Sequence, residues 1–350
     1  MDKLTVAISG CHRMITRKLG SHNFAAALHS IEEVDVVAVF DFDSKTRDEF
    51  IDCWKDVWPR VIAYDDYQKM MTTVNPDILL LATRQTMHAD QIEVAVQSGV
   101  KGILCDKPLV TSLSEMDRVL LACQDIPLLF ALDRRWFDRY RLIRRLITKG
   151  LVGDISSIIS YGLSNLINHG CHWYDSLLAL AGDVEPVWVS GLVEDLSVEP
   201  EDSRRLIDPS GRAQIGLDNG VVLYITVDGK HQGDGLPMSF EVVGSKGRLF
   251  VLDDAKQTFH WTMDETSQIK QIETPRDINP WPAGPAMVSD LVSSIHSGKR
   301  TACDIDQARR ATEIGFAIHQ SSLSSGKRIN LIDLDRSIRI ESFPWGNEPN

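Results

Sequence analysis

The sequence predicts two domains that mix helices and strands. We expect an α/β domain built on a parallel sheet, followed by an α+β domain with a large, mostly antiparallel open sheet. In the first third of the chain, continuously apolar strands alternate with amphipathic helices, which is typical of a parallel sheet covered on both faces. After about residue 125, β-patterned runs dominate. We therefore divide the chain into residues 1–125 and 126–350.

Each element of the first domain follows from its apolar pattern and its turn residues. The strands are expected at 4–9, 34–43, 76–83 and 100–109, and a further strand of the same kind is expected just past the boundary, at 126–132. The helices between them are expected at 23–31, 65–74, 88–99 and 112–124.

The second domain opens with a helix and then becomes rich in strands. Helices are expected at 138–150, 172–182, 286–298 and 304–326. Strands are expected at 154–163, 186–195, 212–229, 239–254 and 258–263. The sequences "LDNG" and "GSKG" interrupt two of these runs and indicate tight hairpin turns. Neighbouring strands joined in this way pair antiparallel.

The composition excludes several classes of protein. The net charge is −12, whereas nucleic-acid binding needs a basic surface. No apolar run approaches the roughly 18 residues that span a bilayer, and the N-terminus lacks a signal-peptide pattern. The six cysteines are scattered, as expected of free thiols in a reducing compartment. We therefore expect a cytoplasmic protein with a small-molecule substrate and no nucleic-acid or membrane partner.

The loop after the first strand departs from a known fingerprint. An apolar strand, a glycine-rich turn G-x-G-x-x-G and a helix together form a dinucleotide-binding unit. Here Gly10 matches, but His12 and Ile15 stand where the motif should continue, and the next glycine is Gly20. The intervening residues include the cations Arg13, Arg17 and Lys18. Two interpretations remain open: a nucleotide site with altered chemistry, or a fold that has lost its cofactor.

Asp41 ends the second strand of the first domain. In a dinucleotide fold, an acid at this position bonds the adenosine ribose hydroxyls and repels a 2′-phosphate, which favours NAD over NADP. Asp43 is close enough in sequence to share this role. The alternative is an ordinary solvated acid at a strand end.

Two further segments follow strands, at the sheet edge where ligands bind. "CDKPLV" places Lys107 just after a strand, from where its ammonium can reach a substrate hydroxyl or carbonyl; the alternative is a surface lysine. "TRQTMHAD" places Thr83, Arg84 and His88 after the preceding strand. For His88 we favour a structural role at the start of the following helix.

A third cluster lies in "NLINHGCHWYDS". If this segment is helical, Asn168, His172 and Asp175 share one face, because they are four and three residues apart. A histidine titrates near neutrality and can exchange a proton with a carbinol oxygen. The alternatives are a metal site formed by His169, Cys171 and His172, which we do not favour because no second ligand cluster supports it, and a structural histidine.

Together these features resemble the glucose–fructose oxidoreductase and inositol dehydrogenase (Gfo/Idh/MocA) family. "DKP" at 106–108 resembles the family's E-K-P, and Thr83 and His88 match its T-P-N-x-x-H, with Arg84 and Gln85 replacing proline and asparagine. The segments 131–140, 242–251 and 303–331 resemble, in order, its arginine segment, its glycine hairpin and its closing helix and tail.

The resemblance implies a Rossmann-like first domain and an NAD(P)-dependent enzyme that moves a hydride between the nicotinamide and a carbinol or carbonyl of a sugar, cyclitol or similar substrate. His172 would be the acid/base, with Lys107 supporting it, and Asn168 takes the place of the family's aspartate. In the family, the glycines let backbone amides approach the pyrophosphate, and His12 would crowd this approach. Arg13, Arg17 or Lys18 would contact phosphate through their side chains instead. The substrate pocket would include residues of both the arginine segment and the histidine cluster: Arg134, Arg135, Asn165, Asn168, His169, Tyr174 and Asp175.

The family resemblance also implies a homodimer or homotetramer built on the open sheet. Two alternatives stay open because the glycine loop is degenerate. One is an enzyme of the same fold that performs non-redox or internally hydride-recycling chemistry. The other is a cofactor-free binding protein.

Overall fold

The computed structural model describes residues 3–161, 165–193, 210–226, 238–264 and 267–340. The chain forms two compact units, each described here by itself. The first contains residues 1–110, 114–136 and 277–308, and the second contains residues 111–113, 137–276 and 309–350. Residues 162–163, 194–195 and 227–229, where strands were also expected, lie outside the described parts of the chain.

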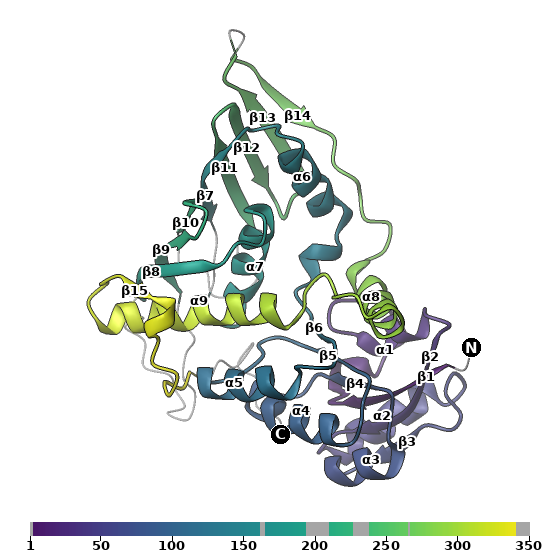
Figure 1. Ribbon diagram of the computed structural model, residues 1–350. Coiled ribbons are helices and arrows are strands. Elements are labelled where there is room, and N and C mark those ends of the chain that lie inside the picture. The colour runs from purple at the N-terminus through teal and green to yellow at the C-terminus, as the bar shows by residue number, and fades with distance from the viewer. Residues whose placement is uncertain (1–2, 162–164, 194–209, 227–237, 265–266, 341–350) are drawn as a thin grey trace. The chain divides into compact units, whose positions relative to one another are not determined.

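The first unit contains a six-stranded parallel sheet with the order β3-β2-β1-β4-β5-β6 (Figure 1). Its strands are β1 (Leu4–Ser9), β2 (Val34–Phe40), β3 (Ile62–Tyr64), β4 (Ile78–Leu81), β5 (Gly102–Cys105) and β6 (Leu128–Phe130). The order reverses between β1 and β4, and in open α/β sheets ligands bind at such a point, beyond the carboxyl ends of the strands. The sequence-based prediction of a parallel α/β sheet is confirmed.

The sheet strands bury both faces because helices cover them. Every residue of β4 and β5 is buried, which explains their continuously apolar sequences. The helices of this unit are α1 (Phe24–His29), α2 (Ser44–Trp54), α3 (Tyr67–Val74), α4 (Gln85–Gln97), α5 (Leu113–Ala122) and α8 (Ala283–Ser297). The short 3-10 turns η1 (His12–Met14) and η2 (Asp133–Trp136) also belong to it.

The second unit contains a nine-stranded sheet with the order β14-β13-β12-β11-β7-β10-β9-β8-β15 (Figure 1). Its strands are β7 (Ile155–Tyr161), β8 (Pro186–Val193), β9 (Gly211–Leu217), β10 (Val222–Ile225), β11 (Ser239–Gly244), β12 (Gly247–Leu252), β13 (Gln257–Thr262), β14 (Ile269–Ile272) and β15 (Ile329–Asn330). All described pairings are antiparallel except that of β7 with β10. The predicted open, mostly antiparallel sheet is therefore confirmed.

Both predicted hairpin turns are present in this sheet. The "LDNG" turn joins β9 to β10, with Gly220 at φ 85°, and "GSKG" joins β11 to β12. Two helices and a 3-10 turn lie in the same unit, α6 (Asp138–Thr148), α7 (Gly170–Leu180) and η3 (Leu331–Asp333). The helix α9 (Ile305–Leu323) begins in the first unit and continues in the second.

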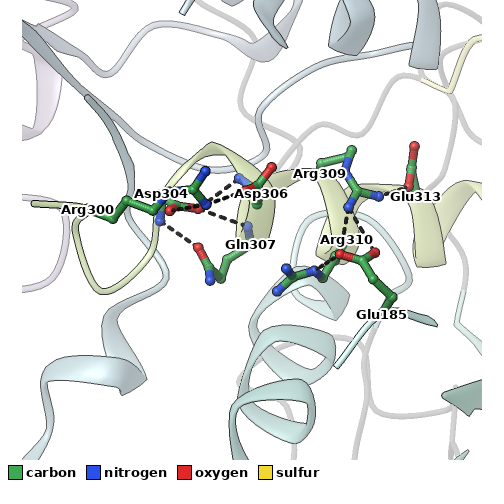
Figure 2. A network of polar contacts seen from close by, with 8 residues as sticks. All are labelled: Glu185, Arg300, Asp304, Asp306, Gln307, Arg309, Arg310 and Glu313. Carbon is green, nitrogen blue, oxygen red and sulfur yellow. Dashed lines mark hydrogen bonds and ion pairs between the residues drawn. The ribbon is translucent and has the colours of Figure 1, made fainter. Parts of the chain in front are cut away.

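Each part of α9 forms ion pairs with residues of its own unit (Figure 2). In the first unit, Asp304 caps the helix by accepting from the backbone N–H of Asp306 at 2.9 Å, and Arg300 pairs with both carboxylates. In the second unit, Glu185 accepts hydrogen bonds from Arg309 at 2.8 and 2.9 Å and from Arg310 at 2.6 Å. Burial alone would raise the pKa of Glu185, but these arginines lower it.

Candidate functional site

Gly10 makes the turn that follows β1 in the first unit. Its φ is 85°, and its N–H donates to the carbonyl oxygen of Phe40 at 2.8 Å. A Cβ at this position would lie 2.7 Å from the carbonyl group of Ala82 and 2.8 Å from the backbone nitrogen of Thr83. Only glycine fits such a turn, because the conformation and the space both exclude a side chain. The loop therefore passes directly over the end of β4, as a nucleotide cradle requires.

Asp41 anchors this loop from the end of β2. Its Oδ2 accepts from the backbone N–H of Cys11 at 2.9 Å, and its Oδ1 accepts from the N–H of Asp43 at 3.2 Å. Burial and then the Asp41 carboxylate raise the pKa of the Cys11 thiol, which keeps it unreactive. Asp43 caps α2 through the N–H and hydroxyl of Thr46 at 2.9 and 2.7 Å. Of the two acids, Asp41 is the one attached to the loop.

The cations of the loop differ in their surroundings. Arg17 donates to the carbonyl oxygen of Cys53 at 2.7 Å and to Asp56 at 3.3 Å, and its guanidinium lies 5.9 Å from the ring centre of Trp54. A phosphate role would require Arg17 to leave these partners. The side chains of Arg13 and Lys18 are exposed and make no hydrogen bond or ion pair with the described residues.

The ends of β1 and β4 share one buried polar cluster. Gln91 of α4 accepts at Oε1 from the hydroxyl of Ser9 at 3.0 Å and from that of Thr83 at 2.9 Å. Arg84 precedes α4 as its N-cap residue without a side-chain cap bond. Ser9 and Gln91 were missed by the sequence analysis, although a hydroxyl that ends the first strand was a usable signal.

His88 lies fully buried on α4. Its Nδ1 lies 3.0 Å from the carbonyl oxygen of Leu109, and its Nε2 lies 3.0 Å from that of Thr83. Burial lowers the pKa of this imidazole, so the neutral form, which has one N–H, is favoured. His88 therefore links the loop after β4 to the chain after Lys107, in keeping with the structural role that we favoured.

Lys107 follows β5 at the same carboxyl edge of the sheet. It is 9% exposed, and its peptide bond to Pro108 is cis. The preceding Asp106 accepts the backbone N–H of Lys107 at 2.8 Å. Both Asp106 oxygens also lie close to Nδ1 of His22, at 3.1 and 3.0 Å. No local sequence signal pointed to His22, because 84 residues separate it from Asp106.

Burial alone would raise the pKa of Asp106. The charges and hydrogen bonds of His22 and Lys107 instead lower it to about 2, so the carboxyl group is ionised at neutral pH. Lys107 is therefore preceded by a negatively charged carboxylate at neutral pH.

The histidine cluster lies in the second unit. His172 and Asp175 belong to α7 and are 8% and 1% exposed. Asn168 is 1% exposed but precedes α7 in a turn, so the expected helix contains only two of the three residues. Asn165 braces this turn, because its Oδ1 accepts the N–H of His169 at 2.7 Å.

Two other expected substrate residues are placed differently. Tyr174 is fully buried on α7, where its hydroxyl would lie 2.7 Å from a Cβ at Gly170. Arg134 belongs to η2 in the first unit and pairs with Asp133 at 3.4 Å. Among the described residues, no three His, Cys, Asp or Glu side chains are placed to hold a metal ion.

The fold and this site define the class of proteins with a dinucleotide-type parallel sheet. The features that define it here are a turn that accepts only glycine, an acid at the end of β2 and a lysine after β5. Comparison with known proteins identifies the class further. Residues 4–131 match the oxidoreductase family with an NAD-binding Rossmann fold, Gfo/Idh/MocA, in agreement with the resemblance found in the sequence.

Curated relatives include dehydrogenases of polyhydroxylated compounds. The chain is 28% identical over 142 residues to trans-1,2-dihydrobenzene-1,2-diol dehydrogenase of Danio rerio; the match covers 39% of this chain and 41% of that protein. It is 20% identical over 312 residues to myo-inositol 2-dehydrogenase of Thermotoga maritima, covering 80% and 84% of the two chains. The first relative is thus matched over less than half of its length.

Solved structures share the whole fold. An oxidoreductase from Agrobacterium radiobacter in complex with NAD+, L-tartaric acid and magnesium superposes with a TM-score of 0.79 at 16% identity, covering 94% of this chain and 98% of that one.

Within the described residues, no helix is long and apolar enough to cross a membrane.

Proposed function

We propose that this protein is an NAD-dependent dehydrogenase that moves a hydride between the nicotinamide and a carbinol or carbonyl carbon of a sugar, a cyclitol or a similar polyhydroxylated molecule. The observation that carries this proposal is the Gly10 turn, which leaves no room for a Cβ above the end of β4. A site that had lost its nucleotide would have no need of so close a backbone approach. The dehydrogenases among its relatives supply the substrate class.

NAD is the expected form of the cofactor. Asp41 presents its carboxylate at the end of β2, where it would accept from ribose hydroxyls and repel a 2′-phosphate. Thr83, Arg84 and Lys107 lie after β4 and β5, at the same edge of the sheet. They are proposed to line the remainder of the nucleotide site together with His12, while the fully buried His88 would support it from behind by holding the chain at Thr83 and Leu109.

The proposed chemistry needs one group that moves a proton and one that polarises the substrate oxygen. The bound nicotinamide supplies the hydride chemistry. His172 would exchange the proton of the substrate hydroxyl, and the Lys107 ammonium would stabilise negative charge on that oxygen. Asn168 is an amide, so it can hold a substrate hydroxyl but cannot carry charge. His169, Asn165, Tyr174, Asp175 and Arg134 are the further proposed substrate residues.

One observation favours a second candidate, a same-fold protein that does not exchange a dinucleotide freely. Arg17, one of the three cations expected to replace the glycine amides, is engaged by Cys53 and Asp56. Such a protein would perform non-redox or hydride-recycling chemistry, or would bind a ligand without cofactor.

Nucleotide titration separates the candidates. The purified protein would be inspected for nicotinamide absorbance and then titrated with NADH and NADPH, with quenching of tryptophan fluorescence as the signal. We expect saturable binding with preference for NADH. Absence of binding by both would reject the dehydrogenase, and bound nucleotide that does not exchange would support the second candidate.

A second experiment tests the catalytic assignment. With a polyol that the protein oxidises, His172→Gln should lower kcat by about 10²-fold or more while the Kd for NADH stays within about threefold. His296→Gln, on α8 of the first unit, is the matched control. Undiminished turnover in His172→Gln would exclude His172 as the proton carrier.

We also propose a homodimer or homotetramer formed through the nine-stranded sheet. One face carries a row of partly exposed apolar side chains from paired strands: Ile159, Tyr161, Tyr224, Phe250 and Phe259. Glu241 of β11 interrupts this row between Ile159 and Phe250, and it pairs with Arg248 at 2.9 Å. Apolar side chains gathered on one exposed face of a sheet mark an association surface. Light scattering should find an oligomer that Phe250→Glu dissociates and that Leu323→Glu, at the exposed end of α9, leaves intact.

The six cysteines are all free thiols, and five are buried. Such thiols are typical of a reducing compartment, which supports the proposed cytoplasmic location.

A further inference from the structure

His22 lies in the unusual loop between β1 and α1 and has a strained backbone. Its φ is 63°, in the left-handed region that residues other than glycine adopt uncommonly. The next residue, Asn23, fixes the loop by donating to the carbonyl oxygens of Thr16 and Lys18 at 2.8 and 2.9 Å. A strained residue persists only where its surroundings over-determine it, and such residues gather at functional sites.

The imidazole of His22 is held on several sides. Its Nδ1 lies 3.0–3.1 Å from both oxygens of Asp106, and the two side chains are 21% and 15% exposed. Its ring centre lies 6.5 Å from that of Trp281, with the planes 29° apart, and 6.4 Å from that of Phe24, edge to face. Trp281 is itself fixed, since its Nε1 donates to Asp133 at 3.2 Å. The ring orientation that directs Nδ1 to Asp106 is therefore determined by packing.

Asp106 passes this constraint to the lysine. The carboxylate accepts the backbone N–H of Lys107 at 2.8 Å, and its own N–H donates to the carbonyl oxygen of Leu81 at 2.8 Å. An aspartate that lost His22 could rotate about its side-chain bonds, and the N–H of Lys107 would then lose a fixed acceptor. The direction of the lysine side chain depends on this peptide, because the held N–H and the side chain belong to the same residue.

We infer that His22 is a positioning residue for Lys107 and acts through the Asp106 carboxylate. This inference rests on the proposed role of Lys107. It gives the loop after β1 a role besides the proposed phosphate binding, because the loop supplies the donor to Asp106, whose carboxylate holds the backbone N–H of Lys107. His22 itself does not need to touch the substrate.

Two isosteric substitutions test the hydrogen bond without adding backbone strain. Asparagine and aspartate both tolerate positive φ, but only the amide of His22→Asn can donate to Asp106. His22→Asp has the same shape and repels the carboxylate. His22→Gly keeps the backbone freedom and removes the donor, and it serves if the aspartate variant does not fold. His29→Asn, on the exposed end of α1, is the control.

The first readout is the reactivity of the Lys107 amine in the protein without nucleotide. Trace labelling with acetic anhydride, read by mass spectrometry relative to Lys45 on α2, reports the environment of each amine. We expect the labelling rate of Lys107 to change about threefold or more in His22→Asp and His22→Gly, because the amine would then lie in a different electrostatic environment. His22→Asn and His29→Asn should stay near the wild type.

The second readout is turnover. His22→Asp should lower kcat about tenfold or more, with the Kd for NADH within about threefold, and His22→Asn should restore most of kcat. Asp106→Asn combined with His22→Asp should lose no more kcat than His22→Asp alone, because the amide that Asp106→Asn introduces can donate to the new carboxylate and removes the repulsion.

The labelling result stands apart from the proposed function, since it needs neither cofactor nor substrate. If wild-type protein bound no nucleotide, the dehydrogenase proposal would fail. The Lys107 labelling rates would still test whether His22 positions Lys107. Identical Lys107 labelling in wild type, His22→Asp and His22→Gly, all with native near-ultraviolet dichroism, would overturn the inference. So would equal losses of kcat in His22→Asn and His22→Asp.

Discussion

The backbone N–H of Cys11 donates a hydrogen bond to the Asp41 carboxylate at 2.9 Å, which joins the loop after β1 to the end of β2. One oxygen of Asp41 thus holds the loop, while the carboxylate keeps lone pairs for a second partner, because an ionised carboxylate has about four acceptor sites. The same side chain can therefore shape the nucleotide loop and select the nucleotide.

Asp41→Asn should narrow the preference for NADH over NADPH. The amide removes the charge that repels a 2′-phosphate but can still accept the Cys11 N–H. We expect the ratio of the two dissociation constants to fall about tenfold, corresponding to about 1.4 kcal/mol. Fluorescence titration with both nucleotides measures it. Asp43→Asn, which alters only the cap of α2, should leave the ratio unchanged; a shift there instead would transfer the ribose role to Asp43.

Gly10→Ala should destabilise the protein strongly. The new Cβ would meet the backbone of Ala82 and Thr83 at 2.7–2.8 Å, and φ is positive. Strain and overpacking together should cost about 2–4 kcal/mol of the free energy of unfolding, measured by urea denaturation. Gly20→Ala is the matched control, since a Cβ added there would have no atom within 4 Å. Similar stability of the two variants would argue against a tight turn.

The sheet of the first unit was predictable because its strands are buried on both faces. "ILLL" of β4 is apolar throughout, and no other element fits so short and apolar a run. Helix α2 and strand β3 were not predicted. Only Thr46, Phe50 and Trp54 of α2 are buried, so its sequence is mostly polar, and β3 has three residues, none of them buried.

The site was predictable where the signal is local. Gly10 and Asp41 follow a strand directly and Lys107 follows β5 after one intervening residue, and such positions lie at the ligand edge of a parallel sheet. The His22–Asp106 contact was not predictable, since its partners are far apart in sequence and neither belongs to a motif that names the other. Asn168 would share a face with His172 only if the helix expected at 172–182 extended back to it. The helix begins at Gly170 instead, and such ends are poorly specified by a sequence pattern.

Arg13→Ala and Lys18→Ala should weaken NADH binding more than Arg17→Ala does. The side chains of Arg13 and Lys18 are exposed in the described loop, whereas Arg17 is attached to Cys53 and Asp56. Loss of one charge-assisted contact to phosphate should raise the Kd about threefold to tenfold. The salt dependence of the Kd should fall in the same variants, because the contact is ionic. If only Arg17→Ala weakened binding, that side chain would have to move on nucleotide binding.

Asp106→Asn should destabilise the protein at neutral pH and lose this effect in acid. The folded pKa of about 2 lies below the ordinary value of 3.8, so the ionised carboxylate contributes stability above pH 4. This contribution disappears as the pH falls from about 4 towards 2 and the group is protonated in both states. The lowering of the Asp106 pKa from 3.8 to about 2 corresponds to about 2 kcal/mol of stability at neutral pH. Urea denaturation at pH 7 and at pH 3 should therefore show a large and then a smaller difference between Asp106→Asn and wild type. Asp48→Asn, at an exposed position on α2, should show no such trend. A pH-independent difference for Asp106→Asn would mean that its carboxylate gains nothing from His22 and Lys107 on folding.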